Sequence, residues 1–157
     1  MLQQYKKIMV AVDGSAEAEL AFKKAVNVTM RNNGELLLAH VIDTRSFQTV
    51  SSFDGMLAEQ ATEMAKQTLA DYEDHAKKAG LNNVTTLIEY GSPKQIIAKE
   101  IPENNNVYLI MLGATGLNAV ERLFIGSVSE YVIRHATCDV LVVRTDLENK
   151  LSKKTND

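Results

Sequence analysis

The chain is short of several residue types that would point to particular classes of protein. Its 157 residues contain one cysteine, no tryptophan and two prolines, and its 17 basic residues do not outnumber its 20 acidic ones. The single cysteine, Cys138, excludes an internal disulfide, and we interpret it as a buried, inert thiol because an apolar run follows it. A net charge of −3 without a basic stripe disfavours nucleic acid as a partner, because affinity for phosphate backbones requires clustered Lys and Arg.

Long hydrophobic runs are missing as well. No apolar segment approaches the ~20 residues of a membrane span, and residues 1–7 lack the apolar stretch of a signal peptide. We therefore expect a cytoplasmic protein without a membrane partner. The length fits one domain over residues 1–146, followed by a polar tail at 147–157 that we expect to fray.

What the sequence does contain is an alternation of strand and helix patterns. Five short apolar runs predict strands, and the first of them, residues 8–12, is continuous rather than alternating in polarity, as expected for a sheet that is covered on both faces. The helices between them have recognisable ends: Ser15, Ser92 before Pro93, and Ser127 at N-termini, and Gly80 at a C-terminus. This alternation predicts an α/β fold with a parallel sheet and right-handed crossovers. The predicted strands span residues 8–12, 36–42, 84–90, 107–112 and 140–143.

Two loops of this fold are candidates for a binding site. Ligands of open α/β sheets bind beyond the carboxyl ends of the strands, where the strand order reverses. Asp13-Gly14-Ser15 follows the first strand, and Gly113-x-x-Gly116, nine residues and Gly126-Ser127 follow the fourth. Glycines let backbone approach a phosphate, and a helix N-terminus attracts anions. The same residues also fit a structural interpretation, with turn glycines, Asp13 capping a helix and Ser127 with Glu130 forming a capping box, and the residues alone leave both open.

Together these segments resemble the universal stress protein family. Gly113-x-x-Gly116, nine residues and Gly126-Ser127 are similar to the G-2x-G-9x-G-[ST] pattern of its ATP-binding members. Residues 8–15, 37–41 and 126–143 resemble its first strand and turn, its second strand and its closing segment. The resemblance implies a single open five-stranded parallel sheet in the order 3-2-1-4-5 with helices on both faces, a Rossmann-like fold similar to the adenine nucleotide alpha hydrolases. Asp139 stands where the family usually has proline, which puts only the local geometry in doubt.

The resemblance also implies that ATP is the ligand and assigns residues to its parts. Ala11 and Val41 flank the adenine, with Val41 offering backbone groups, and Asp13 holds the ribose with help from Gly113. Mg²⁺ or Mn²⁺ would join only through the phosphates; we expect no metal site made by side chains, and interpret His40 as a core residue. Residues 116 and 126–128 cradle the phosphates, and residue 129 lines the same pocket. The full implied cofactor-binding set is Ala11, Val12, Asp13, Val41, Gly113, Gly116, Gly126, Ser127, Val128 and Ser129.

The function implied is a nucleotide-dependent regulatory module of the stress response with little or no catalysis, acting as a homodimer paired through the fifth strand, Asp139 to Arg144. Gly126-Ser127 lacks the lysine of a Gly-Lys-Ser/Thr phosphate loop, so at most weak ATP hydrolysis is expected. Two alternatives stay open: a slow ATPase or adenylyl-transferring enzyme of related fold, and a dimerisation protein that binds no nucleotide. The role of the loop at 43–56 is also left open.

Overall fold

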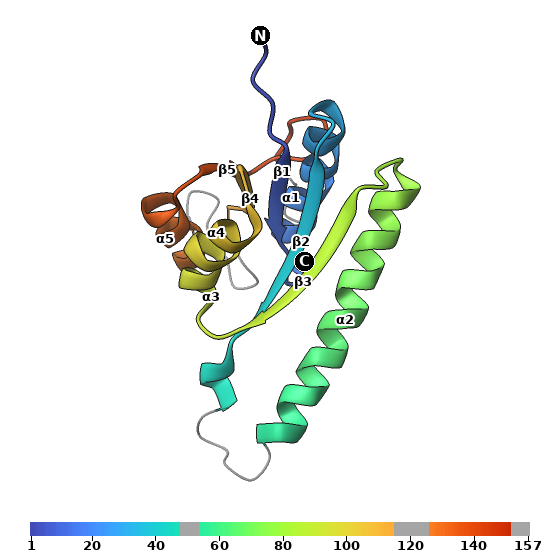
Figure 1. Ribbon diagram of the computed structural model, residues 1–157. Coiled ribbons are helices and arrows are strands. Elements are labelled where there is room, and N and C mark those ends of the chain that lie inside the picture. The colour runs from blue at the N-terminus through green and yellow to red at the C-terminus, as the bar shows by residue number, and fades with distance from the viewer. Residues whose placement is uncertain (48–53, 115–125, 152–157) are drawn as a thin grey trace.

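The strands of the protein form one parallel sheet (Figure 1). The computed structural model describes residues 1–47, 54–114 and 126–151. The strand order is β3-β2-β1-β4-β5, which confirms the expected order, and each strand agrees with a predicted one to within two residues at either end. The fourth begins later than predicted because the Val107 N–H still bonds to the Pro102 carbonyl (3.1 Å). The strands are β1 (Lys7–Ala11), β2 (Glu35–Ile42), β3 (Val84–Tyr90), β4 (Leu109–Gly113) and β5 (Asp139–Val143).

Helices cover both faces of this sheet, with α1 and α2 on one side and α3, α4 and α5 on the other (Figure 1). The helix between β3 and β4 contains a π-helical segment. Pro102 has no N–H to donate to the Ala98 carbonyl, and the Ile101 N–H bonds instead to Ile96, five residues back. The helical segments are α1 (Ala16–Arg31), the 3₁₀ segment η1 (Thr44–Phe47), α2 (Asp54–Lys78), α3 (Pro93–Gln95), the π segment η2 (Ile96–Glu100), α4 (Ile101–Asn105) and α5 (Ser127–His135).

Each face of the sheet has its own apolar core. Ile8, Val10 and Met111 are fully buried toward α1 and α2, whereas their strand neighbours Met9 and Ile110 are fully buried on the opposite face with η2, α4 and α5. Burial on both faces explains why β1, β2 and β4 are apolar without a period of two, whereas the edge strands β3 and β5 are partly exposed. None of the described helices is both long and apolar enough to cross a bilayer.

The predicted helix ends are correct in position, but the cap bonds expected at Ser92 and Ser127 are not formed. Ser15 caps α1, its Oγ accepting from the Ala18 N–H (3.1 Å), and Gly80 follows α2 with φ +102°. Ser92 occupies the cap position before Pro93, as predicted, but its hydroxyl makes no cap bond. At α5 the cap position is Gly126, so Ser127 is the first helical residue and does not form the capping box of the structural interpretation.

The start of the polar tail is tied to α1. Lys24 Nζ donates to Thr145 Oγ1 (2.6 Å) and to Asn149 Oδ1 (3.2 Å). Asp146 Oδ1 accepts from the Lys150 N–H at 2.9 Å. The segment that we expected to fray from Leu147 instead forms a hydrogen-bonded turn as far as Lys150.

Candidate functional site

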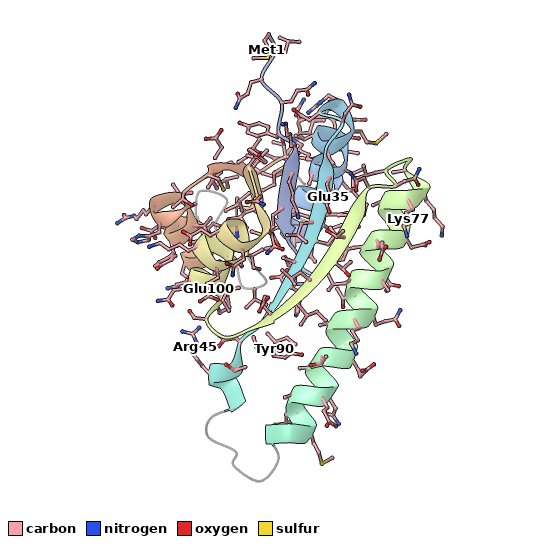
Figure 2. The ribbon with its side chains drawn as sticks, viewed as in Figure 1. Met1, Glu35, Arg45, Lys77, Tyr90 and Glu100 are labelled. Carbon is pink, nitrogen blue, oxygen red and sulfur yellow. The ribbon has the colours of Figure 1, made fainter. Side chains whose placement is uncertain are left out.

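The strand order brings the two candidate loops together. β1 lies between β2 and β4, so the chain leaves β1 and β4 at the point where the strand order reverses. Val10 pairs with Met111, which places the carboxyl ends of β1 and β4 next to each other. The turn that contains Asp13 and the segment that starts at Gly113 therefore begin as neighbours. Figure 2 shows Arg45 and Tyr90 toward the end of the sheet where β2 and β3 finish, and Glu35 toward the opposite end.

The turn after β1 holds Asp13 in place and leaves its carboxylate exposed. Asp13 Oδ1 accepts from the Ser15 N–H (2.9 Å), which closes a turn before α1; because the cap of α1 is Ser15, the interpretation of Asp13 as the helix cap is wrong. Within the described part of the chain, Oδ2 makes no hydrogen bond. Gly14 has φ +82°, a conformation that favours glycine. One carboxylate oxygen thus fixes the turn, while the other makes no bond to the described residues and lies on an exposed side chain at the carboxyl end of β1.

Gly113 is a packing glycine rather than a turn glycine. A Cβ at this position would lie 2.7 Å from both the carbonyl carbon and the oxygen of Glu17, in the first turn of α1. The Gly113 carbonyl also accepts a hydrogen bond from Ser129 Oγ (2.9 Å). Because no side chain fits between β4 and α1, this residue joins the end of β4 closely to α1 and to α5.

The N-terminus of α5 has the features of an anion site. The Gly126 N–H donates to the Ala114 carbonyl (2.9 Å), and no side chain among the described residues caps the helix. The N–H groups of residues 127–129 come first in the helix, where backbone donors lack partners inside the helix and the dipole is positive. Glu130 pairs with Arg134 (3.0 Å) and so does not serve as a cap. The capping-box alternative is therefore wrong.

The side chains of this segment divide between the surface and the interior. Ser127 is exposed and Val128 packs on the second core. Ser129 is buried, and its hydroxyl is occupied by Gly113, so its contribution at the pocket is structural rather than a free hydroxyl. Gly116, predicted to contact phosphate, lies outside the described residues.

The backbone of Val41 faces the end of β1. The bond from Leu36 N–H to the Asn83 carbonyl shows that even-numbered residues of β2 pair toward β3. The bond from Val12 N–H to the Ala39 carbonyl (2.9 Å) shows that odd-numbered residues pair toward β1. Val41 is odd-numbered, but β1 has already ended at Ala11. The N–H and carbonyl of Val41 therefore point to the position beyond the end of β1, where a ligand can take the hydrogen bonds that a longer β1 would have made. The side chains of Val41 and Ala11 pack on the second core.

One residue of this region was missed by the sequence reasoning. His40 Nδ1 lies 2.7 Å from the Val12 carbonyl oxygen. Because a carbonyl can only accept, Nδ1 carries a proton and donates it. His40 was interpreted as a core residue, yet it is half-buried and bonds to the backbone just before Asp13. The signal available was a lone imidazole near the carboxyl end of an otherwise apolar strand.

The electrostatic surroundings are acidic on the α1 side of the site. Burial, followed by the charges of Glu19 and Asp13, raises the pKa of the Tyr72 hydroxyl on α2, which therefore stays neutral. At β5, burial and then the charge of Asp139 raise the pKa of the Cys138 thiol, so it stays protonated at neutral pH. No group of three or more His, Cys, Asp or Glu side chains that could hold a metal lies together in the described ranges.

The comparisons with known proteins agree with this architecture. Residues 4–144 match the model of the universal stress protein family. A Staphylococcus haemolyticus protein named as a universal stress protein is 49% identical over 142 residues, which cover 90% of this chain and 86% of that protein. The solved universal stress protein UspA from Lactobacillus plantarum is 32% identical with a TM-score of 0.83, over 91% of this chain and all of that one.

A more distant solved structure, the universal stress protein of Archaeoglobus fulgidus in complex with dAMP, is 20% identical with a TM-score of 0.64 and shows a likeness of fold. The alignment covers 89% of this chain and 98% of that one. The strand order, the arrangement around the switch point and the family match over residues 4–144 agree, and the chain belongs to the universal stress protein family.

Proposed function

We propose that this protein binds ATP at the carboxyl ends of β1 and β4 and acts as a nucleotide-dependent regulatory module with little or no catalysis. The observation that carries the proposal is the pairing of two groups at the switch point. An exposed carboxylate, Asp13, follows β1, and a helix N-terminus without a described side-chain cap, that of α5, follows β4. A ribose hydroxyl suits the first group and a phosphate suits the second.

The remaining residues fit the base and the phosphates. The backbone groups of Val41 supply the donor and acceptor that an adenine edge requires, beside the half-buried side chain of Ala11. The first N–H groups of α5, those of Ser127 and Val128, would donate to a phosphate, and Gly126 at the cap position places no side chain beside them. Mg²⁺ or Mn²⁺ would be held by the phosphates themselves and would neutralise part of their charge.

The ligand class rests on this chain's own residues, because the dAMP complex is similar in fold alone. A regulatory rather than catalytic role is favoured by the lack of a lysine beside Gly126-Ser127, since phosphoryl transfer requires cations that neutralise developing charge. A cytoplasmic location remains a prediction from the sequence.

The direct test is to denature the purified protein and separate the released nucleotides by anion-exchange chromatography, then to titrate the nucleotide-free protein with ATP by calorimetry. Stoichiometric ATP, or uptake of added ATP, is the expected result. A protein that neither carries nor takes up nucleotide would favour the dimerisation alternative. Release of ADP after addition of Mg²⁺ would favour the slow ATPase.

Asp13 supplies the matching variants. Asp13→Ala is expected to weaken ATP binding by about 1.5–3 kcal/mol, because it removes a hydrogen bond from a charged group. Asp13→Asn retains an oxygen for the Ser15 N–H but lacks the charge, so it should lose affinity while keeping the stability of the turn. Unchanged dissociation constants for both variants, measured by calorimetry, would leave Asp13 with the structural role alone.

The proposal includes a homodimer formed through β5. This strand pairs with β4 on one side only, and its Leu141 side chain is 39% exposed on a sheet edge. Leu141→Asp is expected to convert the dimer to a monomer in sedimentation velocity, because paired edge strands would bury the new charge. Thr86→Asp on the opposite edge strand, β3, is the matched control and should leave the dimer intact. A wild-type protein that sediments as a monomer would refute the dimer.

A further inference from the structure

The chain is fixed at three points just before Asp13. The side chain of Val12 is buried in the first core. Its N–H donates to the Ala39 carbonyl (2.9 Å), and its carbonyl accepts from His40 Nδ1 (2.7 Å). Two consecutive residues of β2 therefore hold both backbone polar groups of Val12, one through its backbone and the other through its side chain.

The side-chain bond replaces one that the sheet does not supply. A parallel ladder continued past the Val12–Ala39 bond would next pair the Val41 N–H with the Val12 carbonyl. That bond does not occur in the described structure, because β1 has ended and the chain turns toward α1. Without the imidazole, the Val12 carbonyl would lack its only described partner inside the protein, and the orientation of the peptide that follows would be less restricted.

That peptide leads directly to the ligand-facing residue. Peptide groups are planar, and the described chain contains no cis bonds, so the direction of the Val12 carbonyl also fixes the direction of the Asp13 N–H and the position of the Asp13 Cα, from which the side chain starts. Asp13 is exposed, and its own bond to Ser15 lies two residues farther along. The orientation of its carboxylate relative to the switch point thus depends on the peptide that His40 holds.

We propose that His40 is a positioning residue of the nucleotide site: its Nδ1–H holds the Val12–Asp13 peptide in the orientation that presents Asp13 to the sugar of the ligand. This inference rests on the proposed function and adds to it a residue that is set back from the ligand. The bond requires a proton on Nδ1 and no particular state of Nε2, so a donor at the Nδ1 position is sufficient.

Three variants separate this role from simple packing. In Asn the amide nitrogen is attached to Cγ, as Nδ1 is in His, whereas in Gln it lies one bond farther out, like Nε2. His40→Leu and His40→Gln are expected to weaken ATP binding roughly three- to tenfold, the worth of one hydrogen bond. His40→Asn is expected to bind within about twofold of wild type, because it restores the donor. Calorimetry gives the affinities, and urea unfolding confirms that each variant is folded.

A second measurement needs no nucleotide. The Ser15 N–H bonds to the Asp13 carboxylate, so its hydrogen exchange reports whether Asp13 is held. Exchange at Ser15 should be faster in His40→Leu and His40→Gln, and close to wild type in His40→Asn. His75→Asn, at an exposed position on α2, should change neither exchange nor affinity.

The two readouts distinguish failure of the inference from failure of the proposed function. Wild-type exchange and affinity in His40→Leu would overturn the inference, as would a His40→Asn variant as impaired as His40→Leu. If wild-type protein takes up no ATP, the proposed nucleotide function fails. Exchange at Ser15 then still decides whether His40 holds the turn.

Discussion

Alanine at position 113 is expected to lower the free energy of unfolding by about 3 kcal/mol, at the upper end of the usual cost of overpacking. The added Cβ would meet the backbone of Glu17 at 2.7 Å, a separation that Cβ atoms do not adopt. Backbone in the first turn of α1 cannot rotate away as a side-chain tip can, so either α1 or the end of β4 must move. Urea unfolding followed by circular dichroism measures the loss.

Gly55→Ala is the matched control for this substitution. A Cβ at Gly55 would meet nothing within 4 Å, and the residue is exposed in the first turn of α2. Its unfolding free energy should stay within about 0.5 kcal/mol of wild type or rise slightly, because alanine favours helix. If Gly113→Ala were as stable as Gly55→Ala, the close packing of α1 on β4 would be refuted.

Gly113 also shows where sequence reasoning reached its limit. The glycine pattern placed this residue at the site, and both interpretations of it, phosphate loop or turn, concerned local conformation. The structure gives a third reason, which is the approach of a helix almost a hundred residues earlier in the chain. When a glycine is required by contact with a distant segment, the sequence around it carries no sign of that contact. The glycine pattern therefore indicated that Gly113 belongs to the site, but not why glycine is needed there.

The strands were predictable because their signal is local. Continuous apolar runs such as residues 36–42 indicate a strand buried on both faces, and residues 84–90 form β3 with the predicted bounds. The strand order came from the family resemblance. Cap chemistry was less predictable: Ser15 uses its hydroxyl and Ser127 does not, although both precede or begin a helix. Ser15 lies at the cap position just before its helix, whereas Ser127 is already the first residue of its helix. Sequence patterns do not resolve a shift of one residue in a helix start.

The bond between His40 and Val12 could not be predicted for a different reason. It depends on β1 ending at Ala11 while β2 continues to Ile42, so that an imidazole replaces the next bond of the ladder. The relative ends of two paired strands follow from the whole sheet. An apolar run that contains one histidine is therefore compatible with a core residue and with a residue that positions the site.

A substitution at Gly126, the cap residue of α5 at the proposed phosphate site, gives the largest expected change in ATP binding. Gly126→Val is expected to weaken ATP binding by more than about 100-fold, equivalent to about 2.7 kcal/mol. Gly126 has φ −59° and ψ 155°, a conformation that every residue can adopt, so its backbone does not require glycine. Its bonds to the Ala114 carbonyl and from the Glu130 N–H use backbone atoms alone and are retained.

The proposed phosphate site supplies a reason for this glycine, because a side chain at the cap position would occupy the place of the ligand. A branched side chain at the cap position would stand beside the first N–H groups of α5 and exclude a phosphate from them, while valine in place of glycine at a cap costs only about 1 kcal/mol of stability. Gly55→Val introduces the same side chain on α2 and should leave the dissociation constant unchanged. Titration with ATP by calorimetry separates the outcomes. A folded Gly126→Val protein that does not bind ATP would support phosphate binding at the N-terminus of α5. A variant that binds ATP as tightly as wild type would show that the phosphates bind elsewhere.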